Sequence, residues 1–304
     1  MRNSDSRARA TQVEWPTLVV LVLCYAVWAV ALFVVAPIST GFAIVLAGFA
    51  IALHSSLQHE ILHGHPFANQ RLNDALVFPS LIVVIPFQRF RDTHLAHHHD
   101  ADLTDPYDDP ETNYLGPASW DRLCIIRRSI FEANRTLFGR MVLGPWIAQY
   151  MFVTSDLKAI RAGDRAVLWG WLWHIPSVAI VGLLIWISSM SFWAYGLAVY
   201  LGVALLKIRT YAEHKAHEKV RGRTVIIEDR GPFALLFLNN NYHVVHHMHP
   251  RVAWYNLPRL FRNQRERYLS CNEGYYFASY AQIFRHFLWR KKDPVVHPFA
   301  QREG

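Results

Sequence analysis

Two pairs of long apolar segments, separated by polar stretches, organise this chain. Residues 17–36 and 40–57 form the first pair, and residues 166–187 and 190–206 form the second. About 17 to 25 apolar residues in a helix cross a bilayer, so each segment is long enough to span one. A short turn signal separates the two members of each pair. The pattern therefore predicts two transmembrane helical hairpins.

The rest of the chain is polar or mixed. Its central section contains two shorter apolar pieces, residues 75–87 and 141–153, which we expect to be re-entrant, interfacial or packed against the bundle. No internal repeat, low-complexity tract or Pro/Gly-rich linker divides the sequence. We predict one domain over residues 1–304, with a cytoplasmic tail at 1–15, a core at about 17–260 and a C-terminal cytoplasmic extension at 261–304.

The basic residues are distributed unevenly. All 31 lysines and arginines lie outside residues 16–57 and 166–206. If both hairpins span the membrane, the basic sections share one side, and the positive-inside rule makes that side the cytoplasm. We expect an all-α membrane protein, with about four transmembrane helices in two hairpins and a cytoplasmic helical cap, in a bacterial inner membrane.

The composition supports this reading and narrows the classes of protein. Hydrophobic residues make up 52% of the chain, but mean hydropathy is only +0.10, as expected for membrane helices plus a sizeable polar part. The net charge of +8 needs no nucleic-acid partner, because no basic–aromatic recognition motif accompanies it. The three cysteines, Cys24, Cys124 and Cys271, form no CxxC pair, which argues against a disulfide framework or zinc ribbon.

Histidine is the unusual residue here, with 17 copies that concentrate in short stretches. The first stretch places His59 and His63 four residues apart, on one face of a helix, where they can share a metal ion. This H-E-x-x-H text is also the pattern of zinc proteases. A zinc protease would explain only residues 59–63 and leave the other histidine stretches without a role.

Two further stretches share the spacing H-x-x-H-H. Positions i, i+3 and i+4 of a helix lie on one face, so each stretch directs three imidazoles the same way. These residues are His94, His97 and His98 in one stretch, and His243, His246 and His247 in the other.

Together the three stretches supply more ligands than one metal ion uses. Neutral imidazole suits iron, zinc, copper and nickel, and a structural zinc site takes four ligands. Eight histidines therefore indicate two metal ions. A non-enzymatic metal transporter is a third possibility, but it should place histidines along a pore, and nearly all of these lie outside the predicted spans.

The order of these motifs resembles the membrane fatty acid desaturase superfamily, which includes acyl desaturases and carotenoid ketolases and hydroxylases. The matching text is QHEILHGHP at 58–66, THLAHHHDADLTDPYDDPE at 93–111 and NYHVVHHMHPRVAWYNLP at 241–258. The resemblance covers roughly residues 17–260. It identifies the superfamily and leaves the substrate open.

The resemblance implies a di-iron centre that uses O2. Its metal ligands would be the eight histidines of the three boxes: His59, His63, His94, His97, His98, His243, His246 and His247. Relatives of this kind add one ligand after the fourth transmembrane helix. Our prediction for that position is His214, with His217 as the alternative.

Other polar residues near the boxes receive expected roles. A metal-bound histidine usually donates its second N–H to a carboxylate or carbonyl, and four acids are placed for this: Glu60, Asp92, Asp100 and Glu213. We expect Asp105, Asp108 and Asp109 to shape a loop with two prolines. The remaining histidines are expected to be supporting or structural (His54, His65, His99 and His249), to bond within the bundle (His174), or to be peripheral (His286 and His297).

The predicted function is oxidation of a membrane lipid. An O2-dependent desaturase would introduce a double bond into an acyl chain, and a hydroxylase or ketolase acting on a carotenoid or other lipid is the alternative. The sequence contains no Cys-based iron–sulfur motif, Gly-rich nucleotide fingerprint or haem domain. Electrons should therefore come from a separate partner, a ferredoxin or a reductase.

Overall fold

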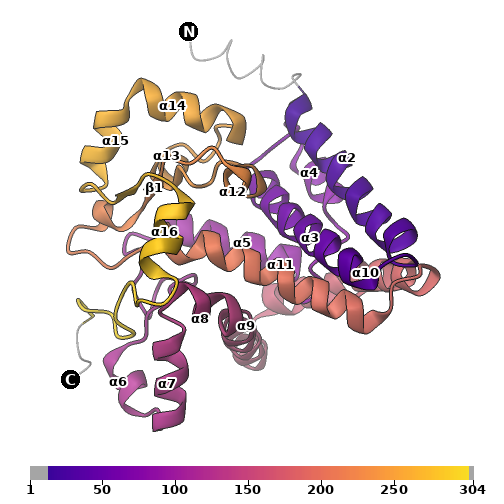
Figure 1. Cartoon of the computed structure of the whole chain (residues 1–304). Helices are drawn as coiled ribbons and strands as arrows, with labels where there is room; N and C mark the ends of the chain where they lie inside the picture. Colours follow the sequence, from indigo (N-terminus) through magenta and orange to yellow (C-terminus); the bar gives the residue numbers. More distant parts are fainter. Residues whose placement is uncertain (1–12, 301–304) are drawn as a thin grey trace.

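The computed structural model describes residues 13–300, which are built almost entirely from helices (Figure 1). A short parallel ladder, β1 (Ile226–Ile227) with β2 (Tyr276–Phe277), is the one named sheet in this part of the chain. The long helices are α2 (Trp15–Val30), continued by the π-helical η1 (Ala31–Val35), then α3 (Thr40–Leu62), α5 (Phe87–His99), α9 (Gly144–Arg161), α10 (Arg165–Ile187) and α11 (Phe192–Glu213).

Shorter helices connect the long ones and build the cap. They are α4 (Gln70–Leu76), α6 (Pro117–Asp121), α7 (Ile125–Ala133), α8 (Leu137–Val142), η2 (Val220–Arg223), α12 (Pro232–Leu236), α13 (His243–Met248), η3 (Trp254–Asn256), α14 (Leu257–Asn263), α15 (Arg265–Cys271) and α16 (Tyr280–Phe287).

Four helical stretches are long and apolar enough to cross a membrane, which confirms the predicted number. They are Trp15–Val35, Thr40–Leu62, Arg165–Trp186 and Phe192–Glu213. Two of them extend further than the apolar runs predicted, because α3 and α11 continue without a break into polar residues at the end nearest the histidines. That continuation places the first box and the position before His214 on rigid helix.

The closest packing in the bundle joins α3 to α11, and glycine makes it possible. A Cβ atom on Gly202 would lie 2.8 Å from Ile51 Cγ2 and 3.1 Å from the Gly48 carbonyl oxygen, and one on Gly48 would lie 2.8 Å from Leu201 Cδ2. These separations are shorter than van der Waals contact, so a larger residue at either position would force the two helices apart. Small residues serve the same purpose in other membrane helix pairs.

The outer faces of the bundle are apolar and exposed. Val22 on α2 and Trp186 on α10 keep 65% and 76% of their surface. A continuous apolar face of this kind is costly in water and favourable in lipid hydrocarbon. This exposed apolar face and the four candidate spans together indicate an integral membrane protein.

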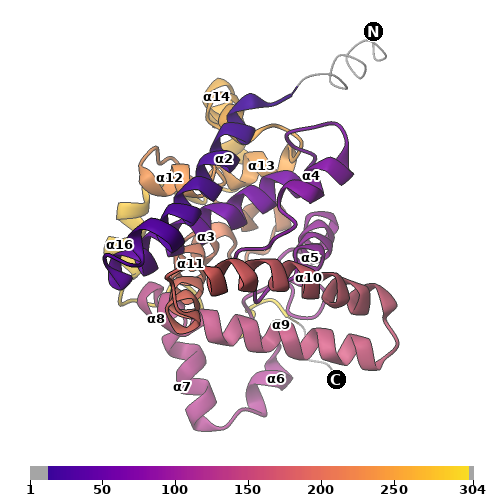
Figure 2. The ribbon, with the colours of Figure 1, turned by 90° about the vertical axis from the view of Figure 1, so that its right-hand side faces the viewer.

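The central section resolves into interfacial and buried parts. The predicted apolar piece 75–87 is largely irregular, and its Leu81 and Ile82 are buried in the main core. The piece 141–153 belongs to α8 and α9, and α9 lies beside α10 (Figure 2). Trp146 and Tyr150 on α9 are exposed, as expected for a helix at a membrane interface.

The C-terminal residues return to the bundle. Phe261, Tyr268 and Tyr280 are almost completely buried, and α16 contributes Ile283 to the same core as α3 and α11. The described part of the predicted extension, residues 261–300, therefore packs closely against the predicted core. Of the predicted tail at residues 1–15, only residues 13–15 belong to the described part of the chain.

Membrane orientation remains a prediction, and reporter fusions test it. With the basic sections in the cytoplasm, alkaline phosphatase fused after Ile38 or Ser189 should be active, since both turns would lie outside. Fusion after Gly163, in the turn before α10, should give an inactive phosphatase and a fluorescent green fluorescent protein. The reverse pattern would contradict the orientation and leave the fold unchanged.

Candidate metal centre

The first histidine box lies where α3 ends. His59 is on the last turn of α3 and His63 is its C-terminal cap residue, so both rings leave the same face, with centroids 5.1 Å apart. The second box occupies α5, where His94, His97 and His98 follow the predicted i, i+3, i+4 spacing on a real helix. The two boxes meet, because the His59 and His94 ring centroids lie 4.5 Å apart.

The third box forms the short helix α13. The backbone N–H of Val244 donates to the Val225 carbonyl at 3.1 Å, which attaches α13 to the residue before β1. His214 arrives by another route, since it is the residue directly after α11 and has extended backbone (φ −129°, ψ 148°). Its ring turns back toward α5 and α13, with the His97 and His243 ring centroids 4.7 Å and 4.8 Å away.

The structure thus brings all nine predicted ligands together, in two groups. Within each group one ligand nitrogen of every residue lies within 4.8 Å of the others. One group has five members, His59, His63, His94, His98 and His246, and the other has four, His97, His214, His243 and His247. The second box supplies both groups, and so does the third.

The nitrogen atoms in these groups have no satisfactory protein partners. Nε2 of His59, His63 and His94 is buried and makes no hydrogen bond. In the other group, His214 Nε2 lies 3.0 Å from both His97 Nε2 and His243 Nε2. A neutral imidazole carries one N–H, so it can donate to only one of two such neighbours. A cation at the centre of each group would accept all these lone pairs, so the donor set fits a metal ion.

Carboxylates on the loop after α5 fix which nitrogen carries the proton. Asp109 Oδ1 lies 2.8 Å from His97 Nδ1, and Glu111 Oε1 lies 2.9 Å from His94 Nδ1. With Nδ1–H donated outward, the Nε2 lone pairs of His97 and His94 point into the groups. As expected, Asp109 shapes its loop, because it accepts the Thr104 and Glu111 backbone N–H groups. The expectation was incomplete, because Asp109 also orients His97.

His243 is oriented through an amide. Asn240 Oδ1 lies 3.1 Å from His243 Nδ1, and Asn240 Nδ2 donates to Glu213 Oε1 at 2.8 Å. The Glu213 carboxylate fixes the orientation of the Asn240 side chain, so its oxygen is left to accept the His243 N–H. Glu213 was expected to accept a histidine N–H directly, but its Oε1 is 3.8 Å from His243 Nδ1 and it acts through Asn240.

Burial keeps most of these imidazoles neutral, the form that binds a metal. It lowers the pKa of His98 and of His214 to about 3, and it holds the pKa of His243, His246 and His247 well below the ordinary value.

His97 is the exception. Burial again opposes its protonated form, but the negative charge of Glu111 and the hydrogen bond to Asp109 outweigh that effect and raise the pKa of His97 to about 9. A metal ion at this group would have to displace that proton.

Three other expected carboxylate contacts are not formed. Asp92 pairs with Arg89 and Arg91 at 3.7 Å and 3.5 Å, and Asp100 Oδ1 accepts the Asp102 backbone N–H. Glu60 accepts the Trp254 backbone N–H at 2.9 Å. These predictions were wrong because an acid that is near a box in the sequence need not point toward its histidines. The carboxylates that do contact box histidines, Asp109 and Glu111, come from a loop that folds back over α5.

The remaining histidines lie outside the two groups. His174 bonds within the bundle as predicted, with Nε2 2.7 Å from the Val83 carbonyl oxygen. His286 is exposed, as expected for a peripheral residue. His297 was expected to be peripheral but is buried, 3.1 Å from Thr104 Oγ1. The others bond elsewhere: His54 to Tyr25, His65 to Glu14, His99 to the Leu95 carbonyl, His217 to Lys219, while His249 contacts the Tyr268 ring.

An open cleft leads to the histidine groups. It has a volume of about 1590 Å³ and is lined by His63, His98 and His247 at one end. Its walls include Trp15 at the start of α2, Leu95 on α5 and other residues from the turn after α3 and from α14, so both apolar and polar side chains line it. This cleft could not be predicted from the sequence, because its walls come from four separate segments.

The fold and the site define a membrane protein with clustered histidines at one end of its spanning helices. Comparison with protein families gives a match to the fatty acid desaturase model over residues 36–279. The chain belongs to the fatty acid desaturase family.

Two curated relatives are distant members of the same superfamily. A beta-carotene ketolase from Paracoccus sp. (strain N81106 / MBIC 01143) is 24% identical over 219 residues, 69% of this chain and 72% of the relative. A beta-carotene ketolase from Paracoccus sp. (strain PC1) is 24% identical over 222 residues, 70% of this chain and 73% of the relative. Together with the family match, they make the chain a membrane oxidoreductase of the desaturase type.

The contact between Asp109 and His97 yields a testable prediction. Asp109→Asn removes the charge that orients His97, and changes of this kind typically weaken metal binding about 10- to 100-fold. Titration of the metal-free purified protein with Co²⁺ would measure the loss. Asp108→Asn is the control, because Asp108 is exposed and contacts no box histidine; equal affinity in the two variants would contradict the assigned role.

Proposed function

We propose that this protein is an O2-dependent acyl-lipid desaturase with a histidine-ligated di-iron centre. The nine ligands would be the five histidines of one group and the four of the other. The observation that carries the proposal is the presence of two adjacent groups of buried imidazoles, whose lone pairs face one another at the end of an open cleft. Two iron ions bound there would supply activation of O2 to an oxidant strong enough for an unactivated C–H bond.

The chain itself would bind and orient the substrate. An acyl chain entering the cleft would lie against Trp15 and Leu95 and approach the groups beside His63, His98 and His247. The packing of the acyl chain against these apolar side chains would select the carbon that is oxidised.

The electron balance calls for a partner. Removing two hydrogens from an acyl chain while both atoms of O2 leave as water consumes two electrons beyond those taken from the substrate. We propose that a ferredoxin or a reductase supplies them, at the cytoplasmic face of a bacterial inner membrane. The basic sections outside the spans give that face a positive charge, which would attract an acidic donor.

Ketolation or hydroxylation of a carotenoid is the second candidate. Both relatives above are named beta-carotene ketolases, and they align over about 70% of this chain. The same histidine groups and the same cleft would serve an isoprenoid substrate, with oxygen added at the carbon where the desaturase would remove hydrogen.

Mass spectrometry of lipids separates these functions. Cells expressing the wild type should contain an acyl species lacking two hydrogens that is absent from cells expressing His247→Ala, because His247 belongs to the four-membered group and lines the cleft. The comparison should be made in a host that also produces β-carotene. A carotenoid or other lipid that gains oxygen only with the wild type would favour the second candidate, and accumulation of the same product with His247→Ala would contradict both.

A further inference from the structure

The last described residues form a strap across the region that surrounds the histidine groups. We call residues 288–297 the C-terminal strap. Its backbone bonds both to the residues around α8 and to the loop after α5: the Lys292 N–H donates to the Arg135 carbonyl at 3.1 Å, and the Leu115 N–H donates to the Val295 carbonyl at 2.9 Å. His297 N–H in turn donates to the Leu115 carbonyl at 3.0 Å. The strap therefore connects segments that are far apart in the sequence.

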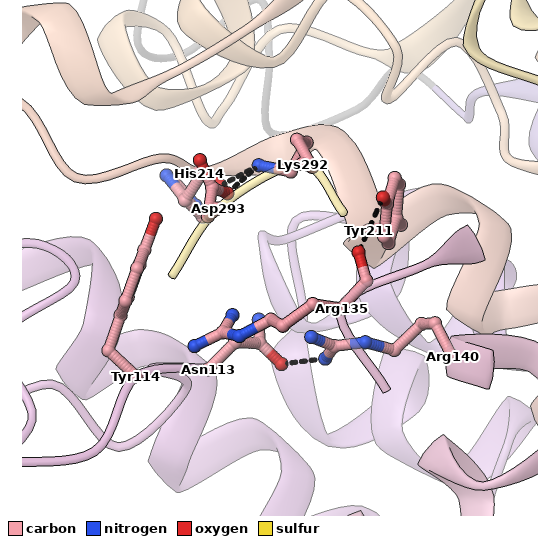
Figure 3. A pocket seen from close by; sticks show the side chains of 8 residues that line it. All are labelled: Asn113, Tyr114, Arg135, Arg140, Tyr211, His214, Lys292 and Asp293. Carbon is pink, nitrogen blue, oxygen red and sulfur yellow. Dashed lines mark hydrogen bonds and ion pairs between the residues drawn. The ribbon is translucent and has the colours of Figure 1, made fainter. Parts of the chain in front are cut away.

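One side chain of the strap reaches a predicted metal ligand. The Lys292 side chain is 9% exposed, and its ammonium group donates to the His214 carbonyl at 3.0 Å and to the Tyr275 hydroxyl at 3.3 Å. It also forms an ion pair with Asp293. Figure 3 shows Lys292 directed at His214 and Asp293, beside a small polar cavity that Arg135 and Arg140 also line.

This contact completes the C-terminal cap of α11. The last carbonyls of a helix lack partners within the helix and form the negative end of its dipole. Here the Tyr275 hydroxyl donates to the Ala212 carbonyl at 2.7 Å, the Val225 N–H donates to the Glu213 carbonyl at 3.0 Å, and Lys292 donates to the His214 carbonyl. The buried ammonium of Lys292 makes a charge-assisted hydrogen bond with the carbonyl of the first residue after the helix.

Backbone contacts on both sides hold the conformation of His214. It leaves α11 in extended conformation, forms an isolated bridge with Thr224 on one side and accepts the Lys292 bond on the other. Its ring must reach the point where Nε2 lies 3.0 Å from His97 Nε2 and from His243 Nε2. No regular helix supports that ring, unlike the rings of the three boxes.

We propose that Lys292 is a positioning residue that holds His214 in the four-membered histidine group from the C-terminal strap, an inference that rests on the proposed metal centre. Lys292 contacts no member of the five-membered group. Its loss should therefore weaken one of the two metal sites and spare the other.

Cobalt titration of metal-free protein tests this. Wild type should bind two Co²⁺ per chain, and Lys292→Met should bind the first as tightly as wild type and the second at least about tenfold more weakly, with a changed visible spectrum for that equivalent. Lys291→Met is the matched control, because Lys291 is exposed and pairs with Glu132 at 2.7 Å. Size exclusion of each purified protein checks that the fold is retained.

Each other outcome has a defined meaning. Unchanged binding of the second Co²⁺ in Lys292→Met, or equal loss of both equivalents, overturns the role of Lys292. A wild type that binds fewer than two Co²⁺ overturns the proposed metal centre itself. If Lys292→Met does not accumulate as folded protein, Lys292→Ala decides: it removes the donor to the His214 carbonyl and leaves room for water, and wild-type affinity for the second Co²⁺ in that variant overturns the inference.

Discussion

The facing ring nitrogens of clustered imidazoles are the constraint on which the rest of this structure depends. Nitrogen atoms of five histidines converge in one group and of four in another, with protons directed outward wherever a carboxylate or amide partner is present. Buried polar atoms without partners are costly, so the arrangement makes physical sense as the binding site of two cations. The close contact of α3 with α11 at Gly48 and Gly202 sets the spacing between the two helices that end at His63 and at His214.

Charge alternates outward from the two groups. The imidazoles form the centre, the acids Asp109, Glu111 and Glu213 lie around them, and cations follow, with Arg209 Nε 3.0 Å from Glu213 Oε1. Two bound divalent cations would be balanced by the acidic layer, and the outer cations stabilise those acids in a region with little water. The C-terminal strap belongs to this outer layer, and through Lys292 it also reaches a ligand directly.

Most of the fold and the eight box histidines could be predicted from sequence, because they depend on local periodicity. Apolar length identified the four spans, and the i, i+3, i+4 rule placed each box on one helix face. His214 came from the family resemblance. What the sequence did not reveal depends on long-range folding: Glu111 as the partner of His94, the burial of His297 and the role of Lys292 all require the loop after α5 and the C-terminus to meet at the site. No spacing rule links residues that are so far apart.

The central claim is that the two histidine groups hold a pair of iron ions, and metal analysis of the purified wild-type protein tests it most directly. Iron should be present at two atoms per chain, with Mössbauer spectra of high-spin iron in nitrogen-rich coordination. The same preparation of protein lacking both H-x-x-H-H boxes should contain none. A wild type that carries a single zinc ion, or that binds no metal after reconstitution with ferrous iron, would contradict the account.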